Sequence, residues 1–576
     1  MSTVLAPPAP EAGPAAPPAP ARAGRYAVPG VLALALALWA VALPSLPDAP
    51  LSEYGLLVSG SPAFAASYVV TVAGFALAVR RRDVRGALAA TLVLLVVQRL
   101  TITLVTDVPP YSWTYKHLGV VDALSSTGHL ARGVDVYNSW PGVFAATAWF
   151  CDVTGVPAAT LAHWFTPGIH LVYVGLTIAL ARAWRRGRLE AVAVAFVVEA
   201  LNWVGQDYYS PQACAIGLAL GVLVVAGLSR ERAVATPVAL LATAAIVVSH
   251  QLTPYWLVAA CGLLMLARRL RPWWLPFAMG ALTLAFLATN ADVAGHFTLL
   301  SFDPVANAQS NIRTTGVFGQ VVTSRVVRGL SVGLWLTAAA AAARGLLARR
   351  RDPRARDVVA PALVAFSPFL ILGGQGYGGE AIFRVFLYAL PGCALLVAPW
   401  LVRALQARTR WCATGALLLT AAVLASGQGL YGGWFPNRMT REQVTFATQL
   451  MARVQPPAYL TVAAPVWPER PTGRYVGFAR FRTGYDYPMI YAAGLTGAHF
   501  DTQDDYDTFT RTIAARTGGP TYLVISRQMK VYDWYFGILP LDALDNLQAR
   551  MTDDPNWEVV YSTDAFTVFV TRTWSS

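Results

Sequence analysis

The sequence DVPPYSWTYKHLGVVDALSSTGHLARGVDVYNSW, residues 107–140, is the first long polar interruption in a chain built mostly of apolar runs. A connector between two membrane helices needs only a few residues, whereas this one is long and mixes acid and base groups with aromatic rings. Its chemistry-bearing side chains are Asp107, Lys116, His117, Asp122, His129, Asp135, Asn138 and Trp140. We therefore predict that residues 107–140 form the active-site loop of a membrane enzyme.

Composition places the bulk of the chain in lipid. The 576 residues are 56% hydrophobic and 13% charged, with a mean hydropathy of +0.47, and a soluble protein could not bury that much apolar surface. The net charge of +13 comes mainly from Arg in short runs between apolar segments, so these runs indicate membrane topology and we expect no nucleic-acid partner. The five cysteines lie in or beside apolar segments, which argues against a disulfide framework or a Cys-based metal site.

Apolar runs of membrane-spanning length flank the polar loop on both sides. They lie at 31–47, 62–79, 86–106, 161–183, 189–205, 212–228, 235–250, 253–268, 274–290, 330–348, 358–373, 384–402 and 411–427. The segment PGVFAATAWFCDVTG, residues 141–155, is too short to cross and is predicted to be re-entrant or to lie in the membrane interface. The fold class is therefore an α-helical polytopic membrane protein with about 13 spans.

Arginine clusters set the predicted orientation. With the N-terminus in the cytoplasm, thirteen crossings put every cluster on the cytoplasmic side, as the positive-inside rule requires. The clusters lie at 80–85, 182–188, 230–232, 268–271, 344–356 and 403–410. Residues 1–29, rich in Pro and Ala, are predicted to be a disordered cytoplasmic tail. The loop 107–140 and most other polar connections then face the cell exterior, so we expect the chemistry to occur at the outer leaflet of the cell membrane.

The composition changes after residue 427, where the transmembrane domain 30–427 ends. TREQVTFATQLMARV reads as a helix capped by Thr440, and LDALDNLQARM as a second helix. AYLTVAAP, PTYLVISR, WEVVYS and AFTVFVTR read as strands. Residues 428–576 are therefore predicted to be a small extracytoplasmic α/β domain.

Asp107 and Asp122 are the candidate catalytic residues. Transfer of a sugar to a hydroxyl requires a group that takes the acceptor proton, and a partly buried carboxylate can do so once its pKa is raised. The alternative for both is a solvated loop residue or a helix cap. The sequence does not choose between the two aspartates.

Glu380 and Arg384, in GYGGEAIFR, are the strongest substrate-binding candidates. They are four residues apart at the start of an apolar helix, so they share a face. Arg384 could grip a phosphate, and the preceding glycines would allow close backbone approach. The alternative is an ion pair that only anchors the helix at the membrane interface.

Other polar residues complete the predicted substrate-binding pocket. They are Lys116, His117, Asn138 and Trp140 in the first loop, Gln206, Asp207 and Tyr208 in the turn QDYYSP, and His250 with Gln251 in SHQLTP. Polar groups at this depth are costly unless they pair or line a wet cavity, although turn formation and a structural role for His250 are the simpler alternatives. The cofactor is left unassigned, and a divalent metal held by the first-loop carboxylates and His250 is one candidate.

These motifs resemble the GT-C superfamily of polyprenyl-phosphate-sugar-dependent membrane glycosyltransferases. YKHLGVVD, YNSWPGVFA, VGQDYYSPQ, SHQLTP and GGEAIFRVFLYALP look more closely like motifs of a group of uncharacterised actinobacterial membrane proteins placed near that superfamily. In that superfamily the acidic loop usually follows the first span, whereas here the first loop has only Asp48 and Glu53 as acids. Either two helices precede the superfamily core or the analogy is loose.

The resemblance implies a function. The chain is expected to transfer a sugar from a polyprenyl-phosphate carrier in the membrane to an envelope glycan, lipid or protein. Two rivals from other classes are a transporter or flippase of lipid-linked saccharides, which would bury charges along several spans, and a non-catalytic protein of envelope assembly. The main charges inside the predicted spans are Arg99 and Glu199.

Overall fold

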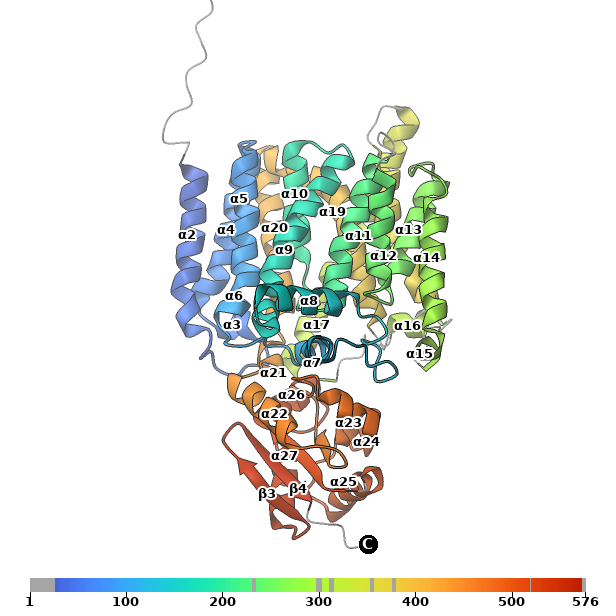
Figure 1. The fold of residues 1–576 in the computed structure, drawn as a ribbon. Coiled ribbons are helices and arrows are strands. Elements are labelled where there is room, and N and C mark those ends of the chain that lie inside the picture. The colour runs from blue at the N-terminus through green and yellow to red at the C-terminus, as the bar shows by residue number, and fades with distance from the viewer. Residues whose placement is uncertain are drawn as a thin grey trace, which may run out of the picture.

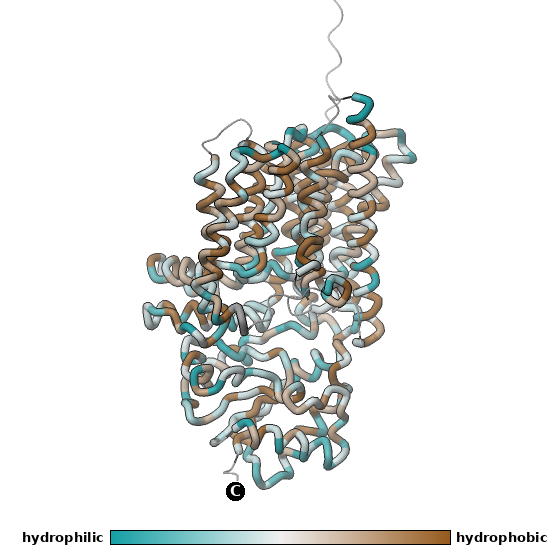
Figure 2. The backbone as a smooth tube through the Cα atoms, turned by 90° about the vertical axis from the view of Figure 1, so that its right-hand side faces the viewer, coloured by the Kyte–Doolittle hydropathy of each residue, from teal (hydrophilic) through white to brown (hydrophobic). Residues whose placement is uncertain are grey.

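The computed structural model describes residues 26–229, 235–296, 303–309, 315–352, 357–374, 380–517 and 519–571. Figure 1 shows a bundle of long helices with a smaller domain at one end, which carries the C-terminus. Hydrophobic residues are concentrated in the bundle, and hydrophilic residues are more frequent in the C-terminal domain (Figure 2). The predicted fold class, a polytopic helical membrane protein with a small C-terminal α/β domain, is confirmed.

Each predicted apolar run falls on a helix. Among the described residues, eight helical segments are long and apolar enough to cross a membrane: α2–η1 (Ala27–Ser45), α4 (Pro62–Arg80), α5–η2–α6 (Val84–Leu104), α9 (Ala158–Ala183), α11 (Pro211–Leu228), α17 (Phe318–Arg351), α19 (Ala381–Gln406) and α20–α21 (Thr409–Asn437). The remaining runs form shorter helices: α10 (Arg188–Leu201), α12 (Thr236–Val247), α13 (Thr253–Leu266), α14 (Leu275–Thr289) and α18–η4 (Val359–Gly373). Short helices α3 (Leu56–Ser59), α15 (Ala291–His296) and α16 (Pro304–Gln309) connect them.

Helices α10 and α19 form the centre of the bundle. Every residue of α10 from Ala191 to Leu201 is buried, and 83% of the apolar window of α19 is buried. A helix that is apolar on all sides is stable only where neighbours cover all of it, and these two helices pack on each other. Glu199 is therefore held in the interior by the helix that carries it.

The third span contains a π-helical turn, η2 (Val96–Leu100), between α5 (Val84–Leu95) and α6 (Thr101–Leu104). Such turns insert one extra residue into a helix and are frequent at functional sites. Arg99 lies in this turn and is completely buried. The turn thus places a cation in the interior of the bundle.

Two helices of the predicted active-site region lie between the bundle and the C-terminal domain. These are α7 (Ser112–Thr127) and α8 (Gly142–Thr154), which run across the end of the bundle in Figure 1. At about 1.5 Å per residue α8 is roughly 20 Å long, shorter than the hydrocarbon core, and its Trp149 and Val153 are exposed. This geometry fits the interfacial alternative predicted for residues 141–155.

The C-terminal domain contains a four-stranded sheet of order β1-β2-β4-β3. Strands β1 (Tyr459–Val462) and β2 (Thr521–Ser526) are parallel, whereas β4 (Phe566–Thr571) is antiparallel to both β2 and β3 (Trp557–Ser562). All four coincide with the predicted strands. The helices are α22 (Arg441–Arg453), α23 (Tyr475–Phe481), α24 (Met489–Ala492), α25 (Gln503–Arg516), α26 (Arg527–Phe536) and α27 (Ala543–Asp553).

The core of the C-terminal domain continues onto α7 and α8. One cluster of buried side chains includes Tyr115 and Leu118 of α7, Phe144 of α8, and Leu523 and Phe569 of the sheet. The predicted cap of α22 is also present, because the Thr440 hydroxyl accepts a hydrogen bond from the Gln443 N–H. The polar loop and the C-terminal domain therefore form one packed unit.

Candidate active site

Helix α7 contacts the C-terminal domain through a group of charged side chains. Lys116 Nζ lies 2.6 Å from Glu469 Oε2 and 3.2 Å from Asp486 Oδ2. Arg470 donates to Asp135 Oδ2 at 2.8 Å and to both oxygens of Asp486 at 2.8 and 3.0 Å. Two cations thus meet three carboxylates, all largely buried.

Neutral contacts extend the same interface. Asp122 Oδ2 accepts a hydrogen bond from the backbone N–H of Gly473 at 2.6 Å, and Asn138 Nδ2 donates to the Tyr475 hydroxyl at 2.8 Å. A Cβ at Gly119 would lie 2.4 Å from the Arg470 carbonyl oxygen, so this helix position requires glycine for close approach. We call the whole set the docking surface; its members are Lys116, Gly119, Asp122, Asp135 and Asn138 against Glu469, Arg470, Gly473, Tyr475 and Asp486.

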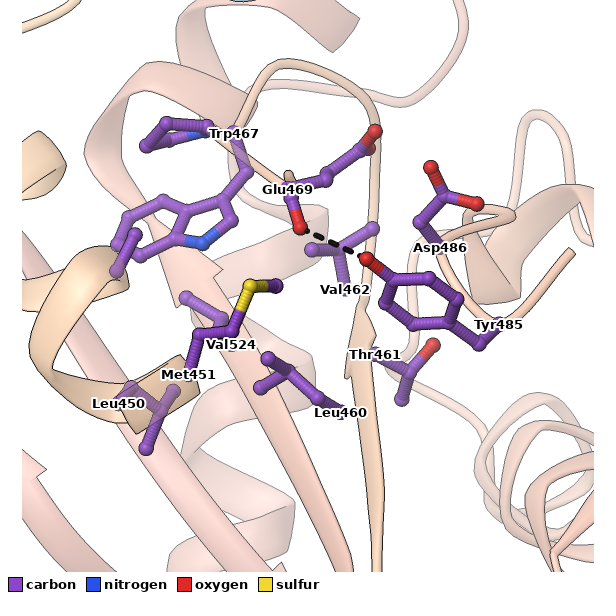
Figure 3. A pocket seen from close by; sticks show the side chains of 12 residues that line it. Leu450, Met451, Leu460, Thr461, Val462, Trp467, Glu469, Tyr485, Asp486 and Val524 are labelled. Atoms are coloured by element: carbon purple, nitrogen blue, oxygen red, sulfur yellow. Dashed lines mark hydrogen bonds between the residues drawn. The ribbon is translucent and has the colours of Figure 1, made fainter. Parts of the chain in front are cut away.

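The docking surface borders a narrow pocket at the carboxyl ends of β1 and β2. The carboxylates of Glu469 and Asp486 lie at the same end of it, and the Tyr485 hydroxyl donates to the Glu469 carbonyl oxygen (Figure 3). Burial raises the pKa of Glu469 to about 7 despite its ion pair with Lys116. Burial also acts to raise the pKa of Asp486, but Lys116 and Arg470 outweigh it and hold that pKa below its ordinary value.

A second charged group lies inside the bundle. Arg99 donates from Nε to Glu199 Oε1 at 3.0 Å and from Nη1 to Asp207 Oδ2 at 2.7 Å. His170, from α9, contacts the same carboxylates: its Nδ1 lies 2.6 Å from Glu199 Oε2 and its Nε2 lies 3.0 Å from Asp207 Oδ2. We call Arg99, His170, Glu199 and Asp207 the buried ion cluster.

A cavity opens beside this cluster, between α10, α11 and α19. It is lined by Tyr173, Val198, Asn202, Val204, Gln206, Asp207, Ile216, Leu220, Leu387, Leu390 and Pro391. Leu387 and Pro391 follow Arg384 at i+3 and i+7, so the three lie on one face of α19. Arg384 therefore stands one turn beyond the cavity wall, at the N-terminal end of the helix.

Arg384 is a buried cation, 4% exposed, whose Nη2 donates to Glu380 Oε2 at 2.6 Å. Tyrosines lie close to this pair. Burial raises the pKa of Tyr208 well above its ordinary value, the neighbouring Tyr111 and Tyr137 hydroxyls add to the rise, and the charge of Arg384 counteracts it. The pKa of Tyr111 is raised in the same way, by burial first and then by Tyr532 and Glu380. The loop, the turn QDYYSP, α19 and α26 thus meet around Arg384.

Two aromatic rings pack against Tyr208. The ring centroids of Tyr111 and Tyr208 are 4.6 Å apart with the rings tilted by 57°, and His117 stacks parallel to Tyr208 at 5.8 Å. His117 Nδ1 donates to the Tyr209 carbonyl oxygen at 2.8 Å, and burial lowers the pKa of His117 to about 4, so this ring is neutral near pH 7. Neutral stacked rings of this kind can hold a sugar face.

Other predicted residues have structural contacts. His250 Nδ1 accepts hydrogen bonds from the backbone N–H groups of Leu252 and Thr253 at 3.3 and 3.2 Å, which caps α13. Burial and the charge of Arg384 lower the pKa of His250 to about 3, so it is neutral. Trp140 packs against Phe286 at 6.0 Å between centroids.

The structure brings together only part of the predicted pocket. Gln206 and Asp207 line the cavity. Tyr208 lies near Arg384 and Glu380 and carries the stacked ring of His117, and the charge of Arg384 also acts on His250. Lys116, Asp122 and Asn138 belong to the docking surface, Asp107 is exposed, and Gln251 is half-buried. The expectation that all of these side chains face one chamber is corrected accordingly, because α7 turns one face toward the C-terminal domain.

Sequence reasoning missed several residues of this site: His170, Asn202 and Tyr111, and the roles of Arg99 and Glu199. Arg99 and Glu199 carried a signal, since each is an isolated charge in an apolar run. His170 is also a polar residue within an apolar run, but its pairing depends on helix contacts. In the described part of the chain, no group of three or more His, Cys, Asp and Glu residues is arranged to hold a metal ion.

Comparisons with known proteins give matches of low similarity. No protein-family model and no curated protein matches the chain. Among solved structures, ArnT from Cupriavidus metallidurans bound to undecaprenyl phosphate matches at 14% identity with a TM-score of 0.45, over 84% of this chain and 97% of that chain. The apo state of the same protein matches at 13% identity with a TM-score of 0.43, over the same shares.

A third solved structure, the arabinofuranosyltransferase AftD from Mycobacteria, matches at 14% identity with a TM-score of 0.39, over 86% of this chain and 40% of that chain. TM-scores below 0.5 describe a loose likeness in the arrangement of helices and carry no argument about the reaction. The chemistry of this chain has to be argued from its own residues.

Proposed function

We propose that this chain is a membrane glycosyltransferase that moves a sugar from a polyprenyl-phosphate carrier to a cell-envelope acceptor on the outer face. The observation that carries the proposal is Arg384, a buried cation one helical turn from a cavity between membrane helices. A guanidinium presents several N–H donors in a fixed fork that matches a phosphate, and Glu380 is bonded to one of its nitrogens, Nη2. The lipid phosphate would bind Arg384 while its chain stays in the bilayer.

The rings beside Arg384 supply a surface for the sugar. Tyr111 and His117 both pack against Tyr208, near which a sugar attached to the phosphate would lie. In the reaction the acceptor oxygen bonds to the anomeric carbon, the bond from that carbon to the phosphate oxygen breaks, and polyprenyl phosphate leaves. The acceptor hydroxyl loses its proton in the same step.

Asp107 is the better candidate for taking that proton. The carboxylate of Asp122 already accepts a hydrogen bond from Gly473 within the docking surface. Asp107 is exposed directly after α6, and its carboxylate accepts no hydrogen bond from any residue that the structure describes. A carboxylate that is not engaged elsewhere can meet an incoming hydroxyl.

The proposed orientation puts the N-terminus in the cytoplasm and the C-terminal domain outside. Arginine-rich ends of helices meet one another: Arg80 donates to the Ala407 carbonyl oxygen, and Arg269 and Arg349 both pair with Asp357. Figure 1 shows the N-terminal end of the described chain and the C-terminal domain at opposite ends of the bundle. Arg-rich ends favour the cytoplasmic side, which leaves Arg384 on the outer side.

The test is sugar transfer from a lipid-linked donor in proteoliposomes. Arg384→Gln removes the cation and is expected to reduce transfer about 100-fold, because charge-assisted bonds to phosphate are lost. Arg403→Gln, at the other end of the same helix and exposed, is the matched control and should transfer as the unchanged protein does. Transfer by Arg384→Gln at the unchanged rate would overturn the proposal.

The buried ion cluster favours one alternative, a flippase of lipid-linked saccharides. Charged side chains deep in a membrane bundle often mark a transport pathway. The two functions separate in the same vesicles: a flippase moves a labelled lipid-linked sugar between leaflets without an acceptor, whereas a transferase releases bare lipid phosphate only when an acceptor is present. Leaflet exchange without transfer would select the alternative.

A further inference from the structure

The cavity beside the buried ion cluster is small and has one polar wall. Its volume of ≈ 30 Å³ admits a water molecule or two, or one hydroxyl-bearing edge of a larger group. Leu387, Leu390 and Pro391 form part of the apolar wall, while Asn202, Gln206 and Asp207 form the polar wall. A carboxylate beside two amides is the side-chain chemistry that recognises hydroxyl groups.

Asp207 is fixed in place by the buried ion cluster. Arg99 Nη1 and His170 Nε2 both approach the same oxygen, Oδ2, at 2.7 and 3.0 Å. Arg99 also anchors the neighbouring backbone, because its Nη2 donates to the Asn202 carbonyl oxygen at 2.6 Å. Arg99 and His170, which do not line the cavity, thus fix the orientation of its polar wall.

The hydrogen bonds also define the charge of the cluster. His170 stands between Glu199 and Asp207 with a carboxylate oxygen within 3.0 Å of each ring nitrogen, and both contacts are hydrogen bonds only if the cluster holds an additional proton. With that proton on His170, two cations balance two carboxylates in a site where uncompensated charge is costly. The other titratable side chains near the cluster are the tyrosines Tyr68, Tyr173 and Tyr431. The cluster is therefore neutral overall, whichever of its groups holds that proton.

Asn202 gives an independent indication of a ligand. Its side chain is 6% exposed, and its Oδ1 has no hydrogen-bond partner among the described residues. Buried acceptors are nearly always satisfied, so an acceptor that lines a cavity without a donor calls for one from outside the protein. A ligand hydroxyl in the cavity can supply it.

We propose that this cavity is a hydroxyl-binding subsite, in which Asn202 and the anchored Asp207 accept hydrogen bonds from the sugar of the lipid-linked donor. The inference rests on the proposed function. It assigns the subsite to the donor sugar and not to the acceptor because of the distance between Arg384 and the cavity. Leu387 lies about 4.5 Å and Pro391 about 10 Å along the axis of α19 from Arg384, so the cavity is within a few ångströms of the proposed phosphate site and within reach of a sugar attached to that phosphate. Arg99, His170 and Glu199 act as positioning residues.

Asn202→Leu tests the subsite on the full-length chain in detergent. Leu has nearly the shape of Asn, and the backbone carbonyl that Arg99 contacts is kept. Thr177→Val is the matched control: Thr177 Oγ1 is also buried without a hydrogen-bond partner among the described residues, but Thr177 does not line the cavity. The probes are undecaprenyl phosphate alone and undecaprenyl phosphate carrying a hexose or a pentose, without any acceptor.

We expect Asn202→Leu to weaken binding of a sugar-bearing lipid about 10-fold and to leave binding of the bare lipid phosphate unchanged. Its midpoint of thermal unfolding should not fall, because an unsatisfied acceptor is replaced by an apolar group. Thr177→Val should change neither affinity. Asn202→Ala is a second variant that removes the same acceptor if the Leu side chain does not fit.

The outcomes separate this inference from the proposed function. If Arg384→Gln abolishes binding of both lipids while Asn202→Leu and Asn202→Ala change neither, the phosphate site stands and the subsite is overturned. If the unchanged protein binds no lipid phosphate at all, the proposed function fails and this inference fails with it. A water-filled cavity without a ligand role predicts equal affinities for both Asn202 variants and Thr177→Val, which also overturns the subsite.

Discussion

The docking surface and the buried ion cluster are both groups of charged side chains, but they differ in setting. The docking surface joins residues 330 or more positions apart along the chain, keeps partial access to water, and carries two carboxylates more than its cations. The buried ion cluster lies wholly within the bundle, with Arg99 at 0% and Glu199 at 2% exposure, and its charges balance. Positive and negative charges have to balance where water cannot screen them, whereas an excess of one sign is tolerated where water can.

The difference shows which polar residues deserve a chemical interpretation. A loop can be rich in polar residues because a second domain packs on it, as the C-terminal domain packs on α7. A few isolated charges in an apolar helix have no such explanation, since each must find a partner inside the membrane. Experiments that break each group in turn sharpen this contrast.

The largest effect is expected from Glu199→Gln in the buried ion cluster. The substitution leaves Arg99 and His170 facing Asp207 alone, and loss of one partner in a buried ion pair costs about 3–5 kcal/mol of unfolding free energy. Thermal unfolding in detergent should show a strong fall in the midpoint. Glu190→Gln, in the first turn of the same helix, is the control and should cost no more than about 1 kcal/mol. Equal midpoints for the two variants would contradict the role assigned to the cluster.

A smaller and more local effect is expected from Arg470→Gln in the docking surface. The change removes the bonds to Asp135 and Asp486, at a cost of about 2–3 kcal/mol to domain docking. Hydrogen exchange should accelerate in α7 and α23, while the midpoint of thermal unfolding of the bundle should not change. Arg480→Gln, exposed on α23, should leave exchange unchanged. Unfolding of the whole chain by Arg470→Gln would show that the docking surface is not an independent element.

The pH dependence of docking is a third test. Burial raises the pKa of Glu469 from 4.5 to about 7, so its contribution to docking is complete below about pH 4.5 and is lost as the pH rises through 7. Between pH 6 and pH 8 the loss amounts to about 1 kcal/mol. The lowered pKa of Asp486 acts only at acid pH, outside this window.

Glu469→Gln should remove this dependence, as followed by the protection factors of α7 at pH 6 and pH 8, each the ratio of the intrinsic to the observed hydrogen-exchange rate at that pH. Burial also raises the pKa of Asp533, in α26, to about 8, which adds a dependence of the same sign to the stability of the C-terminal domain. Asp533→Asn should remove that second component without altering exchange in α7. Protection factors in α7 that are the same at pH 6 and pH 8 in the unchanged protein would count against a titrating Glu469.

Most of the fold could be predicted from the sequence, because hydropathy alone predicts where the apolar helices of the bundle lie. The strands of the C-terminal domain and the Thr440 cap also follow from local pattern. The site was predictable only where its residues are close in sequence. Arg384 and Glu380 are four residues apart at the start of one helix, and Asp207 and Tyr208 are neighbours in QDYYSP. The pairing of His170 with Glu199 depends on how α9 packs on α10, and the docking of Lys116 on Glu469 depends on a contact between domains. Periodicity in one segment contains no information on either.

The smallest effect is expected from Asp122→Asn, and it bears on the residue for which the sequence supports two roles. In the docking surface the carboxylate accepts a hydrogen bond from the Gly473 N–H at 2.6 Å, and an amide oxygen can still accept it, so docking should weaken by no more than about 1 kcal/mol. Sugar transfer should remain close to that of the unchanged protein, whereas Asp107→Asn should reduce it about 100-fold if Asp107 takes the proton. A loss of transfer in Asp122→Asn with normal exchange in α7 would reverse the assignment. The polar loop would then be both a docking surface and a source of the catalytic base.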